Sequence, residues 1–163
     1  MNLKRTPLKR KPPKPKKPKP KQVKTVLLDR LFSIYVRAKS GWVCEAQGWP
    51  GTKCSNRLEC AHGISRRFFV TRWDPENAWC LCSSHHRWFH ECPNEWVEFV
   101  ESKASGRWED LKQRRQSTER TDRERMERFL KERLTAMGIN WNKPLDKRLG
   151  DVVESENEEG LGG

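Results

Sequence analysis

All six cysteines and all four histidines of this 163-residue chain lie between residues 42 and 92. Hydrophobic residues make up only 34% of the sequence, which leaves little apolar material for a large core. Small domains of this kind often obtain part of their folding free energy from a bound metal ion. We therefore expect the cysteines to be metal ligands or buried thiols in a reducing, cytoplasmic compartment, and not three disulfides.

Two short-range pairs within this segment have the spacing of zinc ligands. Nine residues separate the first pair, in a loop with glycine and proline turn signals, and two residues separate the second. Tetrahedral zinc takes four sulfur or nitrogen ligands, so the two pairs predict one structural zinc site. Its expected ligands are Cys44, Cys54, Cys82 and His85. Cys60 or Cys80 could replace one of them, and a set of buried thiols without metal is the remaining alternative.

The residues around the second pair predict a ββα unit. Residues 58–62 and 77–81 have the pattern of two short antiparallel strands, and residues 83–90 have the pattern of a helix. His86 and His90 are four residues apart, so they share one helix face and can hold a single divalent cation. His85, which precedes them, points in another direction and is therefore available to the zinc site. The expected fold class is α+β, with a small zinc-stabilised core flanked by helices.

This unit resembles the HNH, or ββα-metal, nuclease motif. A strand histidine, an asparagine and two helix histidines occur in the order of that motif, as His62, Asn77, His86 and His90. The surrounding stretches 58–67, 71–78 and 81–86 are similar to those of phage NinG/Rap-type recombination endonucleases. The resemblance covers roughly residues 3–115.

The resemblance implies a role for each of these side chains. His62 would be the general base that takes a proton from the attacking water, and Asn77 would orient the loop of His62 through hydrogen bonds. His86 and His90 would hold Mg²⁺, Mn²⁺ or another divalent ion against the scissile phosphate. Three arginines between the strands would clamp phosphates, and these are Arg66, Arg67 and Arg72.

Two positions depart from the family pattern. Ala61 stands immediately before the expected base, where many HNH enzymes carry Asp or His as a further metal ligand. Glu59 could take that part only if the strand twists. Gln47 stands where a cysteine of the first zinc pair is expected, so Cys54 would have to compensate. Without that compensation the zinc site would be weak and could draw in His86.

The two ends of the chain differ strongly in charge. Residues 1–25 hold eleven Lys or Arg and no acid, whereas residues 151–163 hold five acids and no base. This pattern predicts a disordered basic arm over 1–24 and a disordered acidic tail over 146–163. The arm is either a solubility tail or a nonspecific tether, in which Lys14, Lys16 and Lys17 would contact DNA phosphates.

Helical periodicity predicts the segments next to the core. A helix is expected over 25–39, and further helices are expected from residue 94 onward. The last of them, within a charged segment spanning 116–145, is expected to be a solvated surface helix. Trp73 is expected to pack in the core in preference to stacking on a base. The nuclease-like domain with its zinc site is expected to span 25–115.

The resemblance implies a phage-type, metal-dependent HNH endonuclease that nicks DNA, with branched recombination intermediates as a candidate substrate. The alternatives are a catalytically silent zinc-dependent DNA-binding module, an HNH protein that assists phage DNA packaging, an RNA-directed nuclease, and a zinc module that binds other proteins. The basic arm cannot distinguish RNA from DNA, because phosphate contacts carry no such information. No membrane association and no small-molecule substrate are expected, since the sequence has neither a bilayer-spanning apolar stretch nor a secretory signal. The preferred ion and the oligomeric state stay open.

Overall fold

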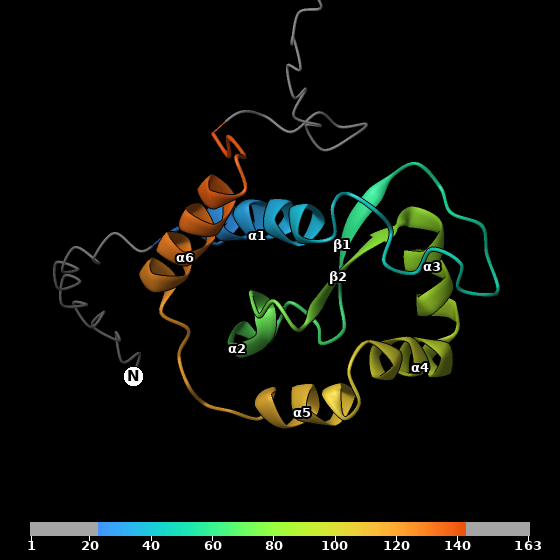
Figure 1. Ribbon diagram of the computed structural model, residues 1–163. Coiled ribbons are helices and arrows are strands. Elements are labelled where there is room, and N and C mark those ends of the chain that lie inside the picture. Colours follow the sequence, from blue (N-terminus) through green and yellow to red (C-terminus); the bar gives the residue numbers. More distant parts are fainter. Residues whose placement is uncertain (1–22, 143–163) are drawn as a thin grey trace, which may run out of the picture.

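The computed structural model describes residues 23–142 of the chain (Figure 1). The elements in chain order are α1 (Thr25–Lys39), β1 (Leu58–His62), α2 (Phe69–Arg72), β2 (Ala78–Cys82), α3 (Ser83–Glu91), α4 (Pro93–Lys103), α5 (Arg107–Arg114) and α6 (Arg123–Ala136). The helices and the small sheet make a mixed α+β structure, as the sequence predicts. The acidic tail and most of the basic arm, including Lys14, Lys16 and Lys17, lie outside the described residues. Among the described residues, no helix has the length and apolarity needed to cross a bilayer.

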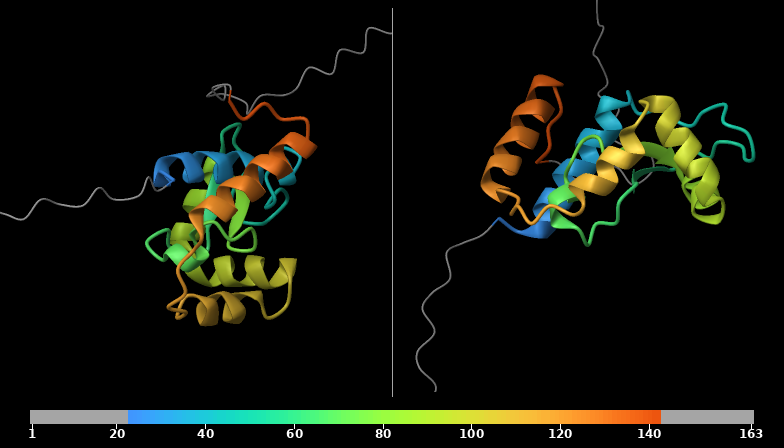
Figure 2. Two further views of the ribbon diagram at one scale, coloured as in Figure 1. Left: turned by 90° about the vertical axis from the view of Figure 1, so that its left-hand side faces the viewer. Right: turned by 90° about the horizontal axis from the view of Figure 1, so that it is seen from below.

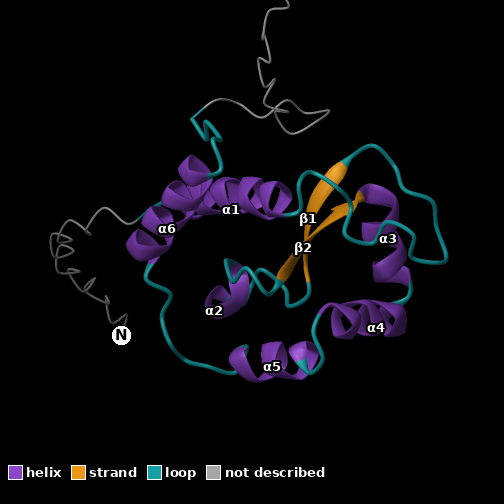
Figure 3. Ribbon diagram, in the orientation of Figure 1, coloured by secondary structure: helices purple, strands orange, loops and turns teal. Residues whose placement is uncertain are grey.

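The two strands form an antiparallel hairpin in which Cys60 lies opposite Cys80 and His62 lies opposite Ala78. Successive side chains of a strand alternate between the two faces of the sheet. The face with Cys60 and Cys80 packs against α1, and the face with Trp79 packs against the helices that follow β2. Figure 3 shows the hairpin between α1 and α3. Both predicted strands are confirmed, the second to within one residue.

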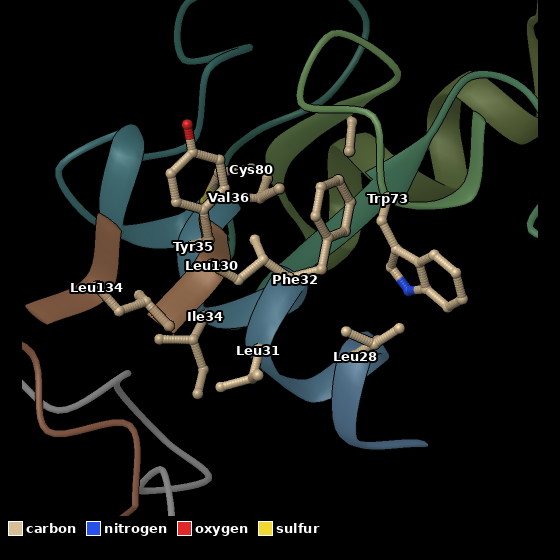
Figure 4. Packing of buried hydrophobic residues seen from close by; sticks show 11 residues of the cluster. Leu28, Leu31, Phe32, Ile34, Tyr35, Val36, Trp73, Cys80, Leu130 and Leu134 are labelled. Atoms are coloured by element: carbon tan, nitrogen blue, oxygen red, sulfur yellow. The ribbon is translucent and has the colours of Figure 1, made fainter. Parts of the chain in front are cut away.

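The apolar face of α1 forms the first of two cores (Figure 4). Its buried side chains recur at helical spacing and are Leu28, Leu31, Phe32, Ile34, Tyr35 and Val36. Leu130 and Leu134 of α6 pack in the same cluster, and Figure 2 shows α6 beside α1. The helix expected at the surface therefore buries one apolar stripe. Trp73, at the end of α2, is 1% exposed in this cluster, which confirms its predicted core position.

Aromatic side chains dominate the second core, between the hairpin and the helices α3, α4 and α5. The ring centroids of Phe89 and Phe99 lie 5.0 Å apart, and those of Trp79 and Phe99 lie 6.3 Å apart. Leu111 is fully buried and anchors α5 to the same cluster. Burying side chains of this size contributes about 1.5–3 kcal/mol each. This core fixes α3 against β2, and α3 carries three of the four histidines.

Candidate functional site

Four side chains from one loop, the end of one strand and the start of one helix come together in a cluster. The metal-binding atoms of Cys44, Cys54, Cys82 and His85 all lie within 4.8 Å of one another. Cys44 and Cys54 come from the loop between α1 and β1. Cys82 is the last residue of β2, and His85 lies in the first turn of α3. Cys82 also caps α3, because its Sγ accepts a hydrogen bond from the backbone N–H of His85 at 3.5 Å. The tight junction between β2 and α3 thus places two of the four side chains.

The spacing of these atoms fits a tetrahedral ion. Nδ1 of His85 lies 3.6 Å from Sγ of Cys44, 3.5 Å from Sγ of Cys54 and 3.1 Å from Sγ of Cys82. Zinc bound to sulfur and to imidazole at its usual bond lengths holds the two ligand atoms about 3.5 Å apart. The other ring nitrogen, Nε2, is buried and has no hydrogen-bond partner among the described residues. The cluster could therefore hold a metal ion such as zinc.

The electrostatics of the cluster favour a cation at its centre. Burial opposes ionisation of Cys82, but hydrogen bonds from the backbone N–H groups of His85 and Ser55 lower its pKa to about 6. Burial raises the pKa of the Cys44 thiol to about 12, and the nearby Cys82 sulfur acts in the same direction. Two thiolates this close repel each other unless a cation lies between them. A bound divalent ion would supply that charge.

The alternative ligands considered from the sequence lie elsewhere. Cys60 and Cys80 face α1 in the first core, so neither takes part in the cluster. Gln47 is exposed. Cys54 does join the other three side chains. His86 is not drawn in, and instead contacts Glu59 and His90.

A second site lies along β1. An open groove of about 990 Å³ is lined by three of the histidines, namely His62, His86 and His90. Residues of α1 form one wall, and Arg57, Glu59 and Arg66 lie along the others. The structure therefore brings the strand histidine and both helix histidines to a single concave surface.

His62 is held in one orientation within this groove. Its Nε2 donates a hydrogen bond to the carbonyl oxygen of Arg72 at 3.0 Å, and its ring packs on Phe32 with centroids 5.6 Å apart. In the neutral ring, Nδ1 is then the nitrogen that accepts a proton. Burial lowers the pKa of His62, and the nearby charge of Arg66 lowers it further. The imidazole is therefore neutral and able to act as a base near neutral pH.

Asn77 clamps the loop that follows His62. Its side chain is fully buried, and its Nδ2 donates to the carbonyl oxygens of Ile64 at 3.0 Å and Thr71 at 2.8 Å. Its Oδ1 accepts from the backbone N–H of Ile64 at 2.6 Å. Its backbone carbonyl accepts from the N–H of Gly63 at 3.0 Å. These three side-chain hydrogen bonds all go to the backbone of the segment between the two strands.

The three predicted phosphate-binding arginines differ in their surroundings. Arg72 makes a two-pronged ion pair with Asp29, at 2.8 and 2.6 Å, and donates to the carbonyl of Arg66 at 2.9 Å. Arg66 and Arg67 are exposed, and neither forms an ion pair with another described residue. Arg66 also lines the groove. Arg66 is therefore the one of the three that faces the groove, whereas the guanidinium of Arg67 packs over the ring of Phe68 and Arg72 ties the loop to α1.

Two functional contacts were underestimated from the sequence. Glu59 reaches His86, with Oε2 2.8 Å from Nδ1, although it was expected to matter only in a twisted strand. The available signal was strand alternation, which puts Glu59 on the same face as Ala61, the position without a ligand atom. Asp29 gave no signal, because its partners Arg72 and Trp73 lie more than forty residues away.

No protein-family model, no curated protein and no solved structure matches this chain. Functional assignment therefore depends on the motif and on the geometry of the groove.

Proposed function

We propose that this protein is a metal-dependent endonuclease of the HNH type that hydrolyses phosphodiester bonds in DNA. The observation that supports it most is the groove itself, which His62, His86 and His90 line together with Arg66. A protein that only bound DNA would have no chemical need for a neutral strand histidine facing the same groove as a histidine pair. The buried Asn77 clamp adds to this, because it fixes the loop next to the proposed base.

The chemistry assigned to the protein side chains is proton transfer and positioning. Nδ1 of His62 accepts a proton from a water molecule as the water oxygen bonds to phosphorus. The bond from phosphorus to the 3′ oxygen breaks, and the leaving oxygen takes a proton from solvent, which gives a 5′ phosphate and a 3′ hydroxyl. Arg66, at the rim of the groove, binds the phosphate next to the cut. A divalent ion held by His86 and His90 would supply charge stabilisation for the phosphate oxygens and the leaving group.

Zinc in the Cys44 cluster has a structural part in this proposal. The cluster joins the loop after α1 to the junction of β2 and α3, so it sets the position of the helix that carries His86 and His90. Zinc sites with four protein ligands have no open position for substrate. The cluster therefore supports the groove and takes no part in hydrolysis.

One observation favours a second candidate, a catalytically silent DNA-binding module. Ala61 is 1% exposed in the second core and offers no ligand atom, so the groove has one metal ligand fewer than many HNH sites. A weakly held ion would leave a protein that binds DNA without cutting it.

A plasmid assay separates the two candidates. Supercoiled DNA is incubated with the full-length protein in Mg²⁺, Mn²⁺, Co²⁺ or Ni²⁺, with EDTA as the control, and binding is measured in parallel by gel shift. The nuclease proposal predicts nicked circles that depend on the metal and carry 5′ phosphates. Binding to the plasmid without nicking in any metal would contradict it and favour the silent module.

A further inference from the structure

Glu59 lies between a histidine and an arginine in the wall of the groove. Its Oε2 is 2.8 Å from Nδ1 of His86, and its Oε1 is 3.3 Å from Nε of Arg57. Both carboxylate oxygens thus face a nitrogen. An ionised carboxylate has no proton to donate, so Nδ1 of His86 is the donor in this hydrogen bond.

This hydrogen bond decides which nitrogen of His86 can bind a metal ion. A neutral imidazole carries one proton, so protonation of Nδ1 leaves the lone pair on Nε2. Nε2 of His86 lies 3.3 Å from Nε2 of His90, one helical turn later. Two imidazole nitrogens bound to one ion at usual bond lengths lie roughly 3.0–3.4 Å apart. The two nitrogens are therefore already at the spacing of ligands that share an ion.

Glu59 does not itself complete this ligand set. It contacts Nδ1 of His86, whereas the contact with His90 is made through Nε2. Among the described residues, only the cysteine cluster brings three or more candidate ligand atoms close enough together to hold a metal ion. Glu59 therefore acts through the imidazole of His86 and not on the ion directly.

We propose that Glu59 is a positioning residue, which holds His86 in the tautomer and orientation that let it bind a divalent ion together with His90. This inference rests on the proposed function, which assigns the ion to the two histidines. Carboxylates that accept a hydrogen bond from a ligating histidine fix its ring and raise its basicity. Glu59 lies two residues before Ala61 on the same strand face, so it strengthens the His86 ligand in a groove where Ala61 offers no ligand atom.

The type of ligand atom also indicates which class of ion the two histidines prefer. Imidazole nitrogens suit late first-row transition ions, whereas Mg²⁺ prefers carboxylate, phosphate and water oxygens. The groove offers two imidazole nitrogens at ligand spacing and keeps its carboxylate behind the ring. The preferred ion is therefore one such as Co²⁺ or Ni²⁺, and not Mg²⁺.

The test measures metal binding without DNA. Full-length protein with one equivalent of zinc is titrated with Co²⁺ and, separately, with Mg²⁺ by calorimetry. We expect one further Co²⁺ ion to bind more tightly than Mg²⁺, and this site to be lost in His86→Ala and in His90→Ala. Glu59→Ala should weaken Co²⁺ binding about 10-fold to 100-fold. Glu59→Gln should fall between, because its amide oxygen still accepts the hydrogen bond. Glu98→Ala, at an exposed site on α4, should bind as the wild type does.

The zinc content and melting temperature of each variant show whether its fold is intact, and Glu59→Gln serves if Glu59→Ala does not fold. The inference is overturned if wild-type protein binds no second Co²⁺, or if both Glu59 variants bind it as tightly as the wild type. The two proposals can fail separately. Metal-dependent nicking with unchanged Co²⁺ affinity in the Glu59 variants would refute the positioning role alone. A Glu59-dependent Co²⁺ site without nicking in any metal would refute the nuclease alone.

Discussion

Asn77 and Ile64 exchange a reciprocal pair of hydrogen bonds, in which Oδ1 of Asn77 accepts from the Ile64 N–H at 2.6 Å and Nδ2 donates to the Ile64 carbonyl at 3.0 Å. The peptide groups of Ile64 are thus held by one side chain that is itself fully buried. Nδ2 also donates to the carbonyl of Thr71 at 2.8 Å, so the same amide closes both ends of the loop between the strands. The orientation of His62 depends on this closure, because its Nε2 bonds to the carbonyl of Arg72, the next residue.

The first prediction concerns this amide. Asn77→Ala leaves the buried N–H and carbonyl of Ile64 without a partner, and each such group costs about 1–3 kcal/mol. The Thr71 carbonyl loses one of its hydrogen bonds and keeps the one from the Asp74 N–H. We expect the free energy of unfolding to fall by about 3 kcal/mol or more, measured by urea denaturation of the zinc-loaded protein. Asn94→Ala, at an exposed position in α4, is the matched control and should change little. Equal stability of the two variants would show that the clamp contributes nothing.

The second prediction concerns the cysteine cluster. Cys82→Ala removes one of four ligands and the cap of α3, so we expect loss of the bound zinc and unfolding of the core. Metal content by mass spectrometry and a melting curve by circular dichroism measure both effects. Cys92→Ala should retain one zinc, because Cys92 lies outside the cluster. An unchanged melting temperature in Cys82→Ala would contradict a structural metal.

The third prediction concerns Gly51, in the loop that presents Cys44 and Cys54. Its φ is +102°, and a Cβ placed there would lie 2.4 Å from the indole ring of Trp88. The ring has little room to move away, because its Nε1 donates to Glu95 at 2.7 Å. We expect Gly51→Ala to destabilise the protein by about 2–4 kcal/mol and to weaken zinc binding.

Gly48→Ala is the control for that substitution. Gly48 also has a positive φ, of +84°, but nothing lies within 4 Å of the added Cβ. This variant should carry only the backbone cost of about 1 kcal/mol. Thermal denaturation of both variants gives the comparison. Equal losses of stability in the two variants would show that the contact between the added Cβ and Trp88 contributes nothing.

The fourth prediction is a pH dependence. Burial is the largest cause of the lowered pKa of His62, and Arg66 acts in the same direction, whereas the hydrogen bond to the Arg72 carbonyl, the charge of Asp29 and the backbone of Cys60 raise it. A general base works only when it is neutral, so activity should be lost as the pH falls through this lowered pKa. We expect the acidic limb of kcat/KM, measured for nicking at saturating metal, to have its midpoint below 6.5. A midpoint at or above that value would argue against His62 as the base.

The fifth prediction concerns the basic arm. Deletion of residues 1–22 removes ten Lys or Arg and should weaken DNA binding. Each lost phosphate contact should reduce the slope of log K against log salt by about 0.9. Fluorescence anisotropy over a salt series measures this slope. Deletion of residues 151–163, which removes five acids and no base, should not flatten it. An unchanged slope after deletion of 1–22 would leave the arm as a solubility tail.

The local elements of this fold follow from short-range patterns. The helix that carries His86 and His90 was predicted from the helical pattern of residues 83–90, and the structure has it over Ser83–Glu91. Cys82 and His85 are three residues apart at a strand–helix junction, so their convergence is also nearly local. Spacing could not choose between Cys54 and the strand cysteines. The hairpin register decides it, because it turns Cys60 and Cys80 toward α1.

Contacts between distant segments could not be predicted from the sequence. The packing of Leu130 and Leu134 on α1 turns a strongly charged helix into part of the core, and the apolar stripe alone does not name its partner. The contact between Glu59 and His86 depends on how α3 crosses β1. Asp29 of α1 accepts hydrogen bonds from both Arg72 and Trp73, and no sequence motif predicts that an acid in this helix will contact them.

The comparison of His62→Ala with the wild type tests the central proposal most directly. Single-turnover nicking of supercoiled plasmid is measured at saturating protein and metal, together with DNA affinity, zinc content and melting temperature. We predict a rate about 10²-fold to 10⁴-fold lower in the variant, with DNA affinity and zinc content unchanged, because the substitution removes the base and no zinc ligand. The melting temperature should fall only by what the lost contacts with Phe32 and the Arg72 carbonyl contribute. Nicking by His62→Ala at the wild-type rate would contradict the proposed mechanism.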